Sequence, residues 1–299
     1  MISQANVRQI FLRVRSAWNY STDLLLDMAI NFKAIAKQIL PSGIGEYSVR
    51  RHAYLRMGLP NREASRMALR AGAYGEIRDA RLDLLPKVIT AKLRTCVDAG
   101  AHRGSWTRAL LLVFRPELVV LVECEPRLVS ELKNTIGRVA RTRVVDAALG
   151  GEDGSAEFFQ LRHPAGSSLL KPRDDIGKQF ERDSWDVVGQ ARVKTVSYDR
   201  LVESEAEVSI LKLDIQGAEA KVLKGSVTGL QKTKAVIMEV TYLSHYEDDS
   251  TFPYLHELMR HNGFGLYRLS DAYHRGDGRA IYADAVYIRE EILQSLTVP

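Results

Sequence analysis

Short apolar runs that favour β-strands alternate with segments of helical periodicity from residue 93 onward. Strands are predicted at 93–98, 118–124, 142–147, 208–214, 234–241, 264–269 and 281–288, and helices at 104–115, 126–139, 218–230 and 251–262. Such alternation favours a mostly parallel sheet with helices on both faces. The pattern therefore predicts an α/β domain over residues 91–299.

The first 90 residues differ, because apolar residues recur at helical spacing over 24–39 without β-type alternation. They are predicted to form an N-terminal helical segment, 1–90, that acts as a cap or as a module for substrate or oligomer contacts. Within the α/β domain, polar-flanked β-like stretches at 155–161 and 192–196 interrupt the alternation. The segment 162–191 is predicted to be a loop or lid over the ligand-binding edge.

Charge and hydropathy narrow the function classes. The net charge is +5, but eleven Lys or Arg against four Asp or Glu give the first 70 residues +7, which leaves −2 for the rest. No apolar run reaches the length of a membrane span, and the N-terminus lacks the apolar core of a secretory signal. A cytoplasmic protein is expected. Cys96 and Cys124 lie in apolar runs without a CxxC partner, so buried free thiols and no zinc site are expected.

The first motif is VDAGAHRG, 97–104, in which a strand ends at Asp98 and a glycine turn leads into a helix. Gly100 permits a tight turn and close backbone approach, and Gly104 lets helix and strand pack closely. The turn lacks the spacing of a dinucleotide fingerprint, since His102 stands where a second glycine is expected. On its own, the motif is equally compatible with an ordinary strand–helix turn.

The second motif is LVVLVECEP, 118–126, a strand with an acidic end. This end lies about 20–25 residues beyond the glycine turn, as expected for a carboxylate that binds ribose hydroxyls. Glu125 is preferred to Glu123 because it lies nearer the carboxyl end of the strand. Asp98 would repel a pyrophosphate, but it suits the positively charged amino group of S-adenosylmethionine. The sequence therefore favours this methyl donor over a nicotinamide cofactor.

Three further strands end in carboxylates. Asp146, followed by Ala147, is a candidate for the adenine amino group or for a simple turn. Asp214 ends the strand of LKLDIQGAE, next to the expected topological switch point of the sheet, where ligands bind. Glu239 ends the next strand, with His245 after it. Because few core partners for these carboxylates are evident, a functional cleft is favoured over a structural role.

Together, VDAGAHRG, ECEP, AALGGEDG, LKLDIQGAEAKVLKG and VIMEVTYLSHYED with FPYLHELMRHNGFGLYRL resemble the FkbM-type S-adenosylmethionine-dependent methyltransferases. The resemblance covers residues 93–289, and its last two motifs are the specific ones. It implies the class I methyltransferase (Rossmann-like) fold, with a seven-stranded sheet whose last strand is reversed. It also implies methyl transfer to a hydroxyl oxygen of a sugar or a natural product.

By match to this family, the cofactor loop holds Asp98, Gly100, Ala101, His102 and Gly104, the ribose position is Glu125, and Asp214 and Glu219 fall on a DxEGxE-like motif. There are two departures. His102 replaces the commonest Asn, and Gln216 replaces the usual Glu, which puts a metal held jointly by Gln216 and Asp214 in doubt. No metal site is predicted.

Methyl transfer to a hydroxyl benefits from a general base, and Asp214, Glu239 and His245 face the predicted cleft. We expect Asp214 or His245 to orient and deprotonate the acceptor, since the ordinary pKa of histidine, about 6.5, suits this role. Glu219, in the first turn of the following helix, is given a structural role favoured by the helix dipole.

Three alternatives stay open: a non-catalytic S-adenosylmethionine-binding or scaffold protein, a nicotinamide-dependent oxidoreductase, and a nucleic-acid methyltransferase. The retained Asp98 and Glu125 disfavour the non-catalytic protein, and the glycine turn disfavours the oxidoreductase. The net charge of −2 beyond residue 70 disfavours the nucleic-acid methyltransferase. The basic N-terminal helices either cap the catalytic domain, the favoured reading, or contact the anionic inner face of a membrane. Expected partners are a small-molecule or glycan acceptor with a free hydroxyl and a second copy of the chain.

Overall fold

The computed structural model describes residues 81–139, 141–176 and 185–296 of the chain. They belong to one compact unit, Glu76–Pro299. Residues 1–80 of the predicted N-terminal segment lie outside the described residues, so their helical character and the boundary at residue 90 stay predictions. The described end of that segment forms two short helices, η1 (Leu82–Leu84) and α5 (Lys87–Thr90).

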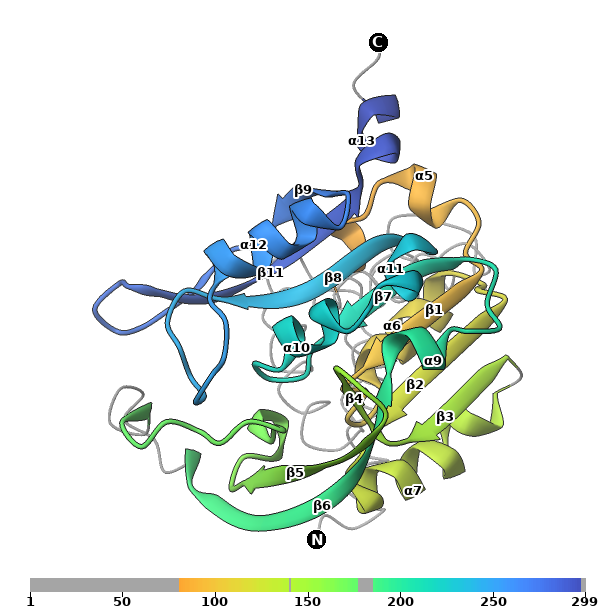
Figure 1. Ribbon diagram of the computed structural model, residues 1–299. Coiled ribbons are helices and arrows are strands. Elements are labelled where there is room, and N and C mark those ends of the chain that lie inside the picture. The colour runs from red at the N-terminus through yellow and green to blue at the C-terminus, as the bar shows by residue number, and fades with distance from the viewer. Residues whose placement is uncertain (1–80, 140, 177–184, 297–299) are drawn as a thin grey trace, which may run out of the picture. The chain divides into compact units, whose positions relative to one another are not determined.

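An eight-stranded sheet forms the centre of this unit, with the strand order β10-β11-β8-β7-β1-β2-β3 and with β9 also paired to β11 (Figure 1). The strands are β1 (Thr95–Ala99), β2 (Leu118–Glu123), β3 (Thr142–Asp146), β7 (Val208–Leu213), β8 (Thr233–Thr241), β9 (Phe264–Leu269), β10 (Tyr273–His274) and β11 (Ala280–Arg289). Strands β3, β2, β1, β7 and β8 are parallel, whereas β11 is antiparallel to β8, β9 and β10. The mostly parallel sheet with a reversed strand is confirmed. Its eighth strand, β10, has two residues and is too short for a sequence pattern.

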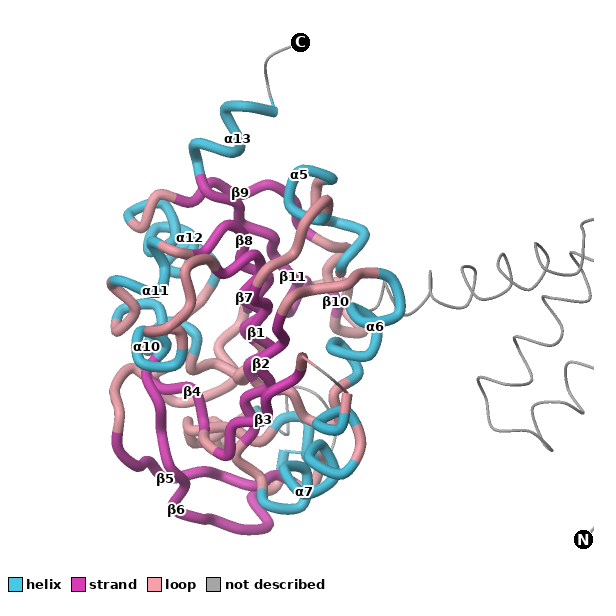
Figure 2. Tube along the Cα trace, turned by 90° about the vertical axis from the view of Figure 1, so that its right-hand side faces the viewer, coloured by secondary structure: helices cyan, strands magenta, loops and turns pink. Residues whose placement is uncertain are grey.

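Two hydrophobic cores flank the sheet, because successive side chains of a strand point to opposite faces. The helices are α6 (Ser105–Val113), α7 (Pro126–Asn134), η2 (Ile136–Arg138), η3 (Pro164–Gly166), α9 (Tyr198–Leu201), α10 (Glu219–Lys224), α11 (Thr228–Gln231), α12 (Phe252–His261) and α13 (Glu290–Leu296). In β1, Val97 packs in the core that α9–α12 cover, while Cys96 packs in the core that η1, α5 and α6 cover. Figure 2 shows α10–α12 on one side of the strands and α5 and α6 on the other. The predicted cover on both faces is confirmed.

The helix predicted at 218–230 is divided into α10 and α11 at a close backbone contact. A Cβ added at Gly225 would overlap the carbonyl oxygen of Gly151. Gly151 in turn lies against the backbone of Lys221, inside α10. Two residues without side chains therefore let the end of α10 touch the turn after β4 (Ala148–Gly150).

A separate three-stranded sheet has the order β4-β6-β5. Strand β5 (Gly154–Leu161) pairs antiparallel with β6 (Val187–Ser197), so the two predicted β-like stretches are partners. The predicted loop 162–191 is shorter than expected at its end. Val187 already lies opposite Leu161, and pairing with β5 draws the last five residues of the loop into β6.

Candidate active site

A pocket of about 1040 Å³ lies at the carboxyl ends of β1, β2, β7 and β8. Its walls come from the turn after β1, the end of β2, residues 147–149, Phe158 of β5 and the segment 164–169. The order of the sheet reverses between β1 and β7, and ligands of open α/β sheets bind at such a switch point. The predicted residues that line the pocket are Gly100, Ala101, His102, Glu125, Ala147, Asp214 and Glu239, and those that do not are Asp98, Gly104, Asp146 and His245.

The turn after β1 is held tightly against the end of β7. Gly100 has φ +70°, and a Cβ there would overlap the carbonyl oxygen of Asp214. His102 has φ +48°, a left-handed conformation that His and Asn tolerate better than most residues. Its backbone N–H donates to Glu123 Oε2 at 2.8 Å. Gly104 precedes α6 and lies close to Leu132 of α7 and Ile136 of η2, so its close contact is with helices and not with a strand as predicted.

The two glutamates at the end of β2 have different environments. Glu123 is 8% exposed, and its carboxylate accepts hydrogen bonds from the backbone N–H groups of His102, Cys124 and Glu125. Glu125 precedes α7 and lines the pocket. Among the described residues, its carboxylate has no hydrogen-bond or ion-pair partner. Glu125 is therefore available for a ligand with two hydroxyls, whereas Glu123 holds the turn.

Asp98 lies beneath the pocket rather than on its surface. Its side chain is 0% exposed, and Thr107 Oγ1 donates to Asp98 Oδ2 at 2.7 Å. Its other oxygen, Oδ1, lies 3.1 Å from Lys212 Nζ. Because its side chain is fully buried beside these two partners, Asp98 does not line the pocket, and its direct contact with the cofactor amino group stays a prediction.

Lys212 is a pocket residue that the sequence reading missed. Its Nζ lies 3.1 Å from Asp98 Oδ1, 3.4 Å from Asp214 Oδ2 and 3.1 Å from the carbonyl oxygen of Gly100. Burial alone lowers the pKa of Lys212, but the two carboxylates outweigh it and hold that pKa above its ordinary value. The available signal was a lysine inside the apolar strand of LKLD. Such a lysine needs a charged partner, and the strand-end carboxylates provide it.

Asp214 presents a carboxylate to the pocket. Its side chain is 46% exposed, and Gln216 Nε2 donates to Asp214 Oδ1 at 2.8 Å. The hydroxyl of Tyr246 donates to the carbonyl oxygen of Gly166 at 2.7 Å and lies 3.1 Å from Gln216 Oε1. Gln216 has φ +55°, which places it in the turn after β7. Gln216 and Lys212 therefore hold one carboxylate oxygen of Asp214 each.

Glu239 also lines the pocket, but its chemistry differs from that of Asp214. Burial, followed by the charges of Asp214, Glu219 and Asp284, raises the pKa of Glu239 well above its ordinary value. Asp284 lies opposite Glu239 on β11 and accepts a 2.6 Å ion-paired hydrogen bond from Arg81. The raised pKa shifts Glu239 toward its neutral form, in which the carboxyl group can donate a hydrogen bond.

His245 lies away from the pocket. It is 3% exposed, and its ring packs against the rings of Trp185, Tyr246 and Tyr282. Burial, opposed by the charge of Asp249, lowers the pKa of His245 to about 4. The structure thus corrects the expectation that His245 faces the cleft, since aromatic packing fixes the ring in the protein interior.

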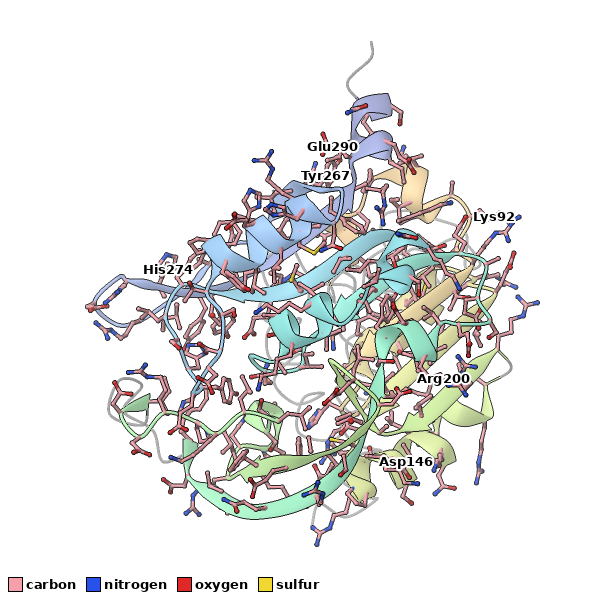
Figure 3. All side chains as sticks on the ribbon, in the orientation of Figure 1. Lys92, Asp146, Arg200, Tyr267, His274 and Glu290 are labelled. Atoms are coloured by element: carbon pink, nitrogen blue, oxygen red, sulfur yellow. The ribbon has the colours of Figure 1, made fainter. Side chains whose placement is uncertain are left out.

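Two further expectations concern residues beside the pocket. Asp146 is exposed at the end of β3 (Figure 3). Its carboxylate pairs with Lys133 of α7 at 3.4 Å. The pocket reaches Ala147 but not Asp146, and the contact of Asp146 with adenine stays a prediction. Glu219 is buried in the first turn of α10 and accepts a 3.1 Å hydrogen bond from the Ile215 N–H, as its predicted structural role requires.

The described residues contain no group of three or more His, Cys, Asp or Glu side chains placed to hold a metal ion. They include no helix that is both long and apolar enough to cross a membrane. Both cysteines are free thiols. Cys96 is buried, as expected, while Cys124 is partly buried.

Residues 98–266 match the family model described as the methyltransferase FkbM domain. The 2-O-methyltransferase NoeI of Sinorhizobium fredii (strain NBRC 101917 / NGR234) is 24% identical over 165 residues, which make up 50% of this chain and 65% of that protein. The chain thus spans less than two thirds of this relative.

The solved structures that are similar to the chain include two methyltransferases. The FkbM methyltransferase of Methylobacillus flagellatus KT has 17% identity and a TM-score of 0.40, over 66% of this chain and 43% of that one. Magnesium protoporphyrin IX methyltransferase of Synechocystis PCC 6803, solved with bound S-adenosylmethionine, has 11% identity and a TM-score of 0.37, over 75% and 78%.

Proposed function

The chain belongs to the FkbM family of methyltransferases, and on that premise we propose that it methylates a hydroxyl group of a sugar or a natural product with S-adenosylmethionine as donor. The observation that carries the proposal is the Asp214 carboxylate, which lines the pocket directly beside the glycine turn. A relative named as a 2-O-methyltransferase supports a hydroxyl oxygen as the acceptor atom.

The pocket residues fit the proposed donor. Glu125 offers two carboxylate oxygens without competing partners among the described residues, which suits two neighbouring ribose hydroxyls. Ala147, Leu149 and Phe158 give one wall an apolar surface suited to an adenine ring. The carboxylate of Asp214 on the pocket surface suits a positively charged sulfonium.

When bound, S-adenosylmethionine supplies a methyl group that a nucleophilic oxygen can attack. The protein must then position the acceptor hydroxyl and remove its proton. We assign Asp214 as the group that accepts this proton, because its carboxylate is accessible and is oriented from both sides by Lys212 and Gln216. Glu239, with its raised pKa, is assigned the role of a hydrogen-bond donor to the acceptor.

The test combines an acceptor screen with one substitution. The full chain is incubated with S-adenosylmethionine and a panel of hydroxylated glycans and natural products, and mass spectrometry detects the gain of one methyl group. Asp214→Asn is expected to lower kcat by about 100-fold or more, the contribution typical of a general base. Calorimetry is expected to show a cofactor affinity within about tenfold of wild type, because the substitution removes the proton acceptor and keeps the other cofactor contacts.

Asp271→Asn is the matched control, since it removes a carboxylate from an exposed residue that does not line the pocket. It is expected to keep wild-type turnover. Near-normal turnover of Asp214→Asn would remove Asp214 as the base. Tight cofactor binding without methylation of any acceptor would favour the non-catalytic alternative.

The remaining expectations about partners stay proposals. We retain a small-molecule or glycan acceptor and a second copy of the chain as candidate partners, and no nucleic acid. The choice between a cap and a membrane contact concerns residues 1–80, which lie outside the described part of the chain.

A further inference from the structure

Lys212 occupies a position that couples two parts of the pocket. In the paired register of β1 and β7, Asp98 lies beside Lys212, so their side chains share one face of the sheet. Asp214 follows two residues later and points to the same face. The ammonium group therefore lies between a buried carboxylate and a pocket carboxylate, at 3.1 Å and 3.4 Å.

The same ammonium group also contacts the glycine turn. Its distance to the carbonyl oxygen of Gly100 is 3.1 Å, while the backbone N–H of Asp214 donates to the carbonyl oxygen of Ala99 at 3.2 Å. The turn after β1 and the end of β7 are thus joined by a charged side chain and by backbone.

Lys212 lies among several carboxyl groups around the pocket. The carboxyl groups that face Asp214 from β1, α10, β8 and β11 are Asp98, Glu219, Glu239 and Asp284, and Arg81 is paired with Asp284. Ionised neighbours of like sign disfavour the charged form of a carboxyl group, whereas a cation in contact favours it. Lys212 is the cation in direct contact with Asp214.

We propose that Lys212 is a positioning residue that keeps the pocket-facing carboxylate of Asp214 ionised and fixes it relative to the glycine turn. The role of this carboxylate as proton acceptor rests on the proposed function, but its ionisation can be measured without cofactor or acceptor. Asp98 has the opposite influence, because it shares the ammonium group of Lys212 and carries a negative charge itself.

The test follows the titration of Asp214 by carboxyl ¹³C NMR of the full chain without cofactor, with the signal identified by its absence in Asp214→Asn. Lys212→Met, which keeps an unbranched side chain, is expected to raise the titration midpoint of Asp214 by about one pH unit or more. Asp98→Asn, which can still accept from Thr107, is expected to lower it. Lys234→Met is the matched control, since Lys234 pairs with Glu207 at 2.8 Å outside this cluster, and it should leave the midpoint unchanged.

A merely structural lysine would leave the midpoint unchanged in Lys212→Met. An unchanged Asp214 midpoint in that variant would overturn the inference, and if Lys212→Met does not fold, Lys212→Gln is measured in its place. When an acceptor is supplied, the acid limb of the pH–rate profile should shift in the same direction as the Asp214 midpoint measured by NMR. Shifted midpoints in a protein that transfers no methyl group would support the role of Lys212 and overturn the proposed function. An active enzyme with unshifted midpoints would support the proposed function and overturn the role of Lys212.

Discussion

Gln216→Glu tests how the turn after β7 controls Asp214. The amide nitrogen of Gln216 donates to Asp214 Oδ1 at 2.8 Å, and the substitution places a carboxylate oxygen there. Two unit charges at this distance of 2.8 Å repel by about 1.5 kcal/mol in water and by about 6 kcal/mol at an effective dielectric constant of about 20. These limits correspond to about 1 to 4 pKa units for the pair.

The accessible side chain of Asp214, 46% exposed, places the effect toward the lower limit because solvent screens the charges. We therefore expect the acid limb of the kcat–pH profile to move up by about 1–2 units in Gln216→Glu. At high pH, turnover should return to within about tenfold of wild type, because Lys212 still contacts the second oxygen of Asp214 and restores most of its orientation.

The assay measures methyl transfer between pH 5 and 10, with calorimetry of cofactor binding at the two ends of the range. Gln231→Glu adds the same charge at an exposed residue of α11 and is expected to leave the profile in place. A profile of Gln216→Glu that superimposes on that of the wild-type protein would refute the reasoning, since Asp214 would then be insensitive to its nearest neighbour.

Two further predictions concern stability. Gly100→Ala places a Cβ against the carbonyl oxygen of Asp214 at φ +70°, so unfolding by urea should show a loss of about 2 kcal/mol or more, with weaker cofactor binding by calorimetry. Gly276→Ala, where a Cβ meets open space, is its control, and equal losses in both would contradict the clash. Burial holds the pKa of His245 at about 4 in the folded protein. As the pH falls below about 6.5, the imidazole therefore binds a proton in the unfolded chain before it does in the folded protein. The stability that this residue contributes at pH 7 is lost toward pH 4. His245→Phe should remove about 2 kcal/mol of the difference in urea stability between pH 7 and pH 5, and an unchanged difference would show that the buried ring is not its source.

The turns at the strand ends could be predicted from sequence because their determinants are local. Gly100 and Gly104 lie within one short motif, and both have the positive φ that such a turn requires. The acidic end of β2 could be located in the same way. The choice between its two glutamates depended on which carboxylate the backbone N–H groups occupy, and this requires coordinates.

The contacts that correct the sequence reading are non-local. Lys212 meets Asp98 only because β7 lies next to β1 in the sheet, an adjacency that no local pattern contains. His245 follows β8 closely, but its side chain turns toward Trp185, which comes from the predicted loop region. Strand periodicity shows which residues alternate, whereas the depth of each side chain depends on what packs against it.

The contact between Gly151 and Gly225 sets the position of the pocket wall that we assign to the adenine ring. It brings the turn after β4 directly against α10, and β4 and β5 supply Leu149 and Phe158 to the pocket wall. The spacing between this wall and the helix that follows Asp214 is therefore set by main chain, which cannot change rotamer. A wall held in this way should tolerate few changes to the adenine ring of the cofactor, and substitution of either glycine should relax that selectivity.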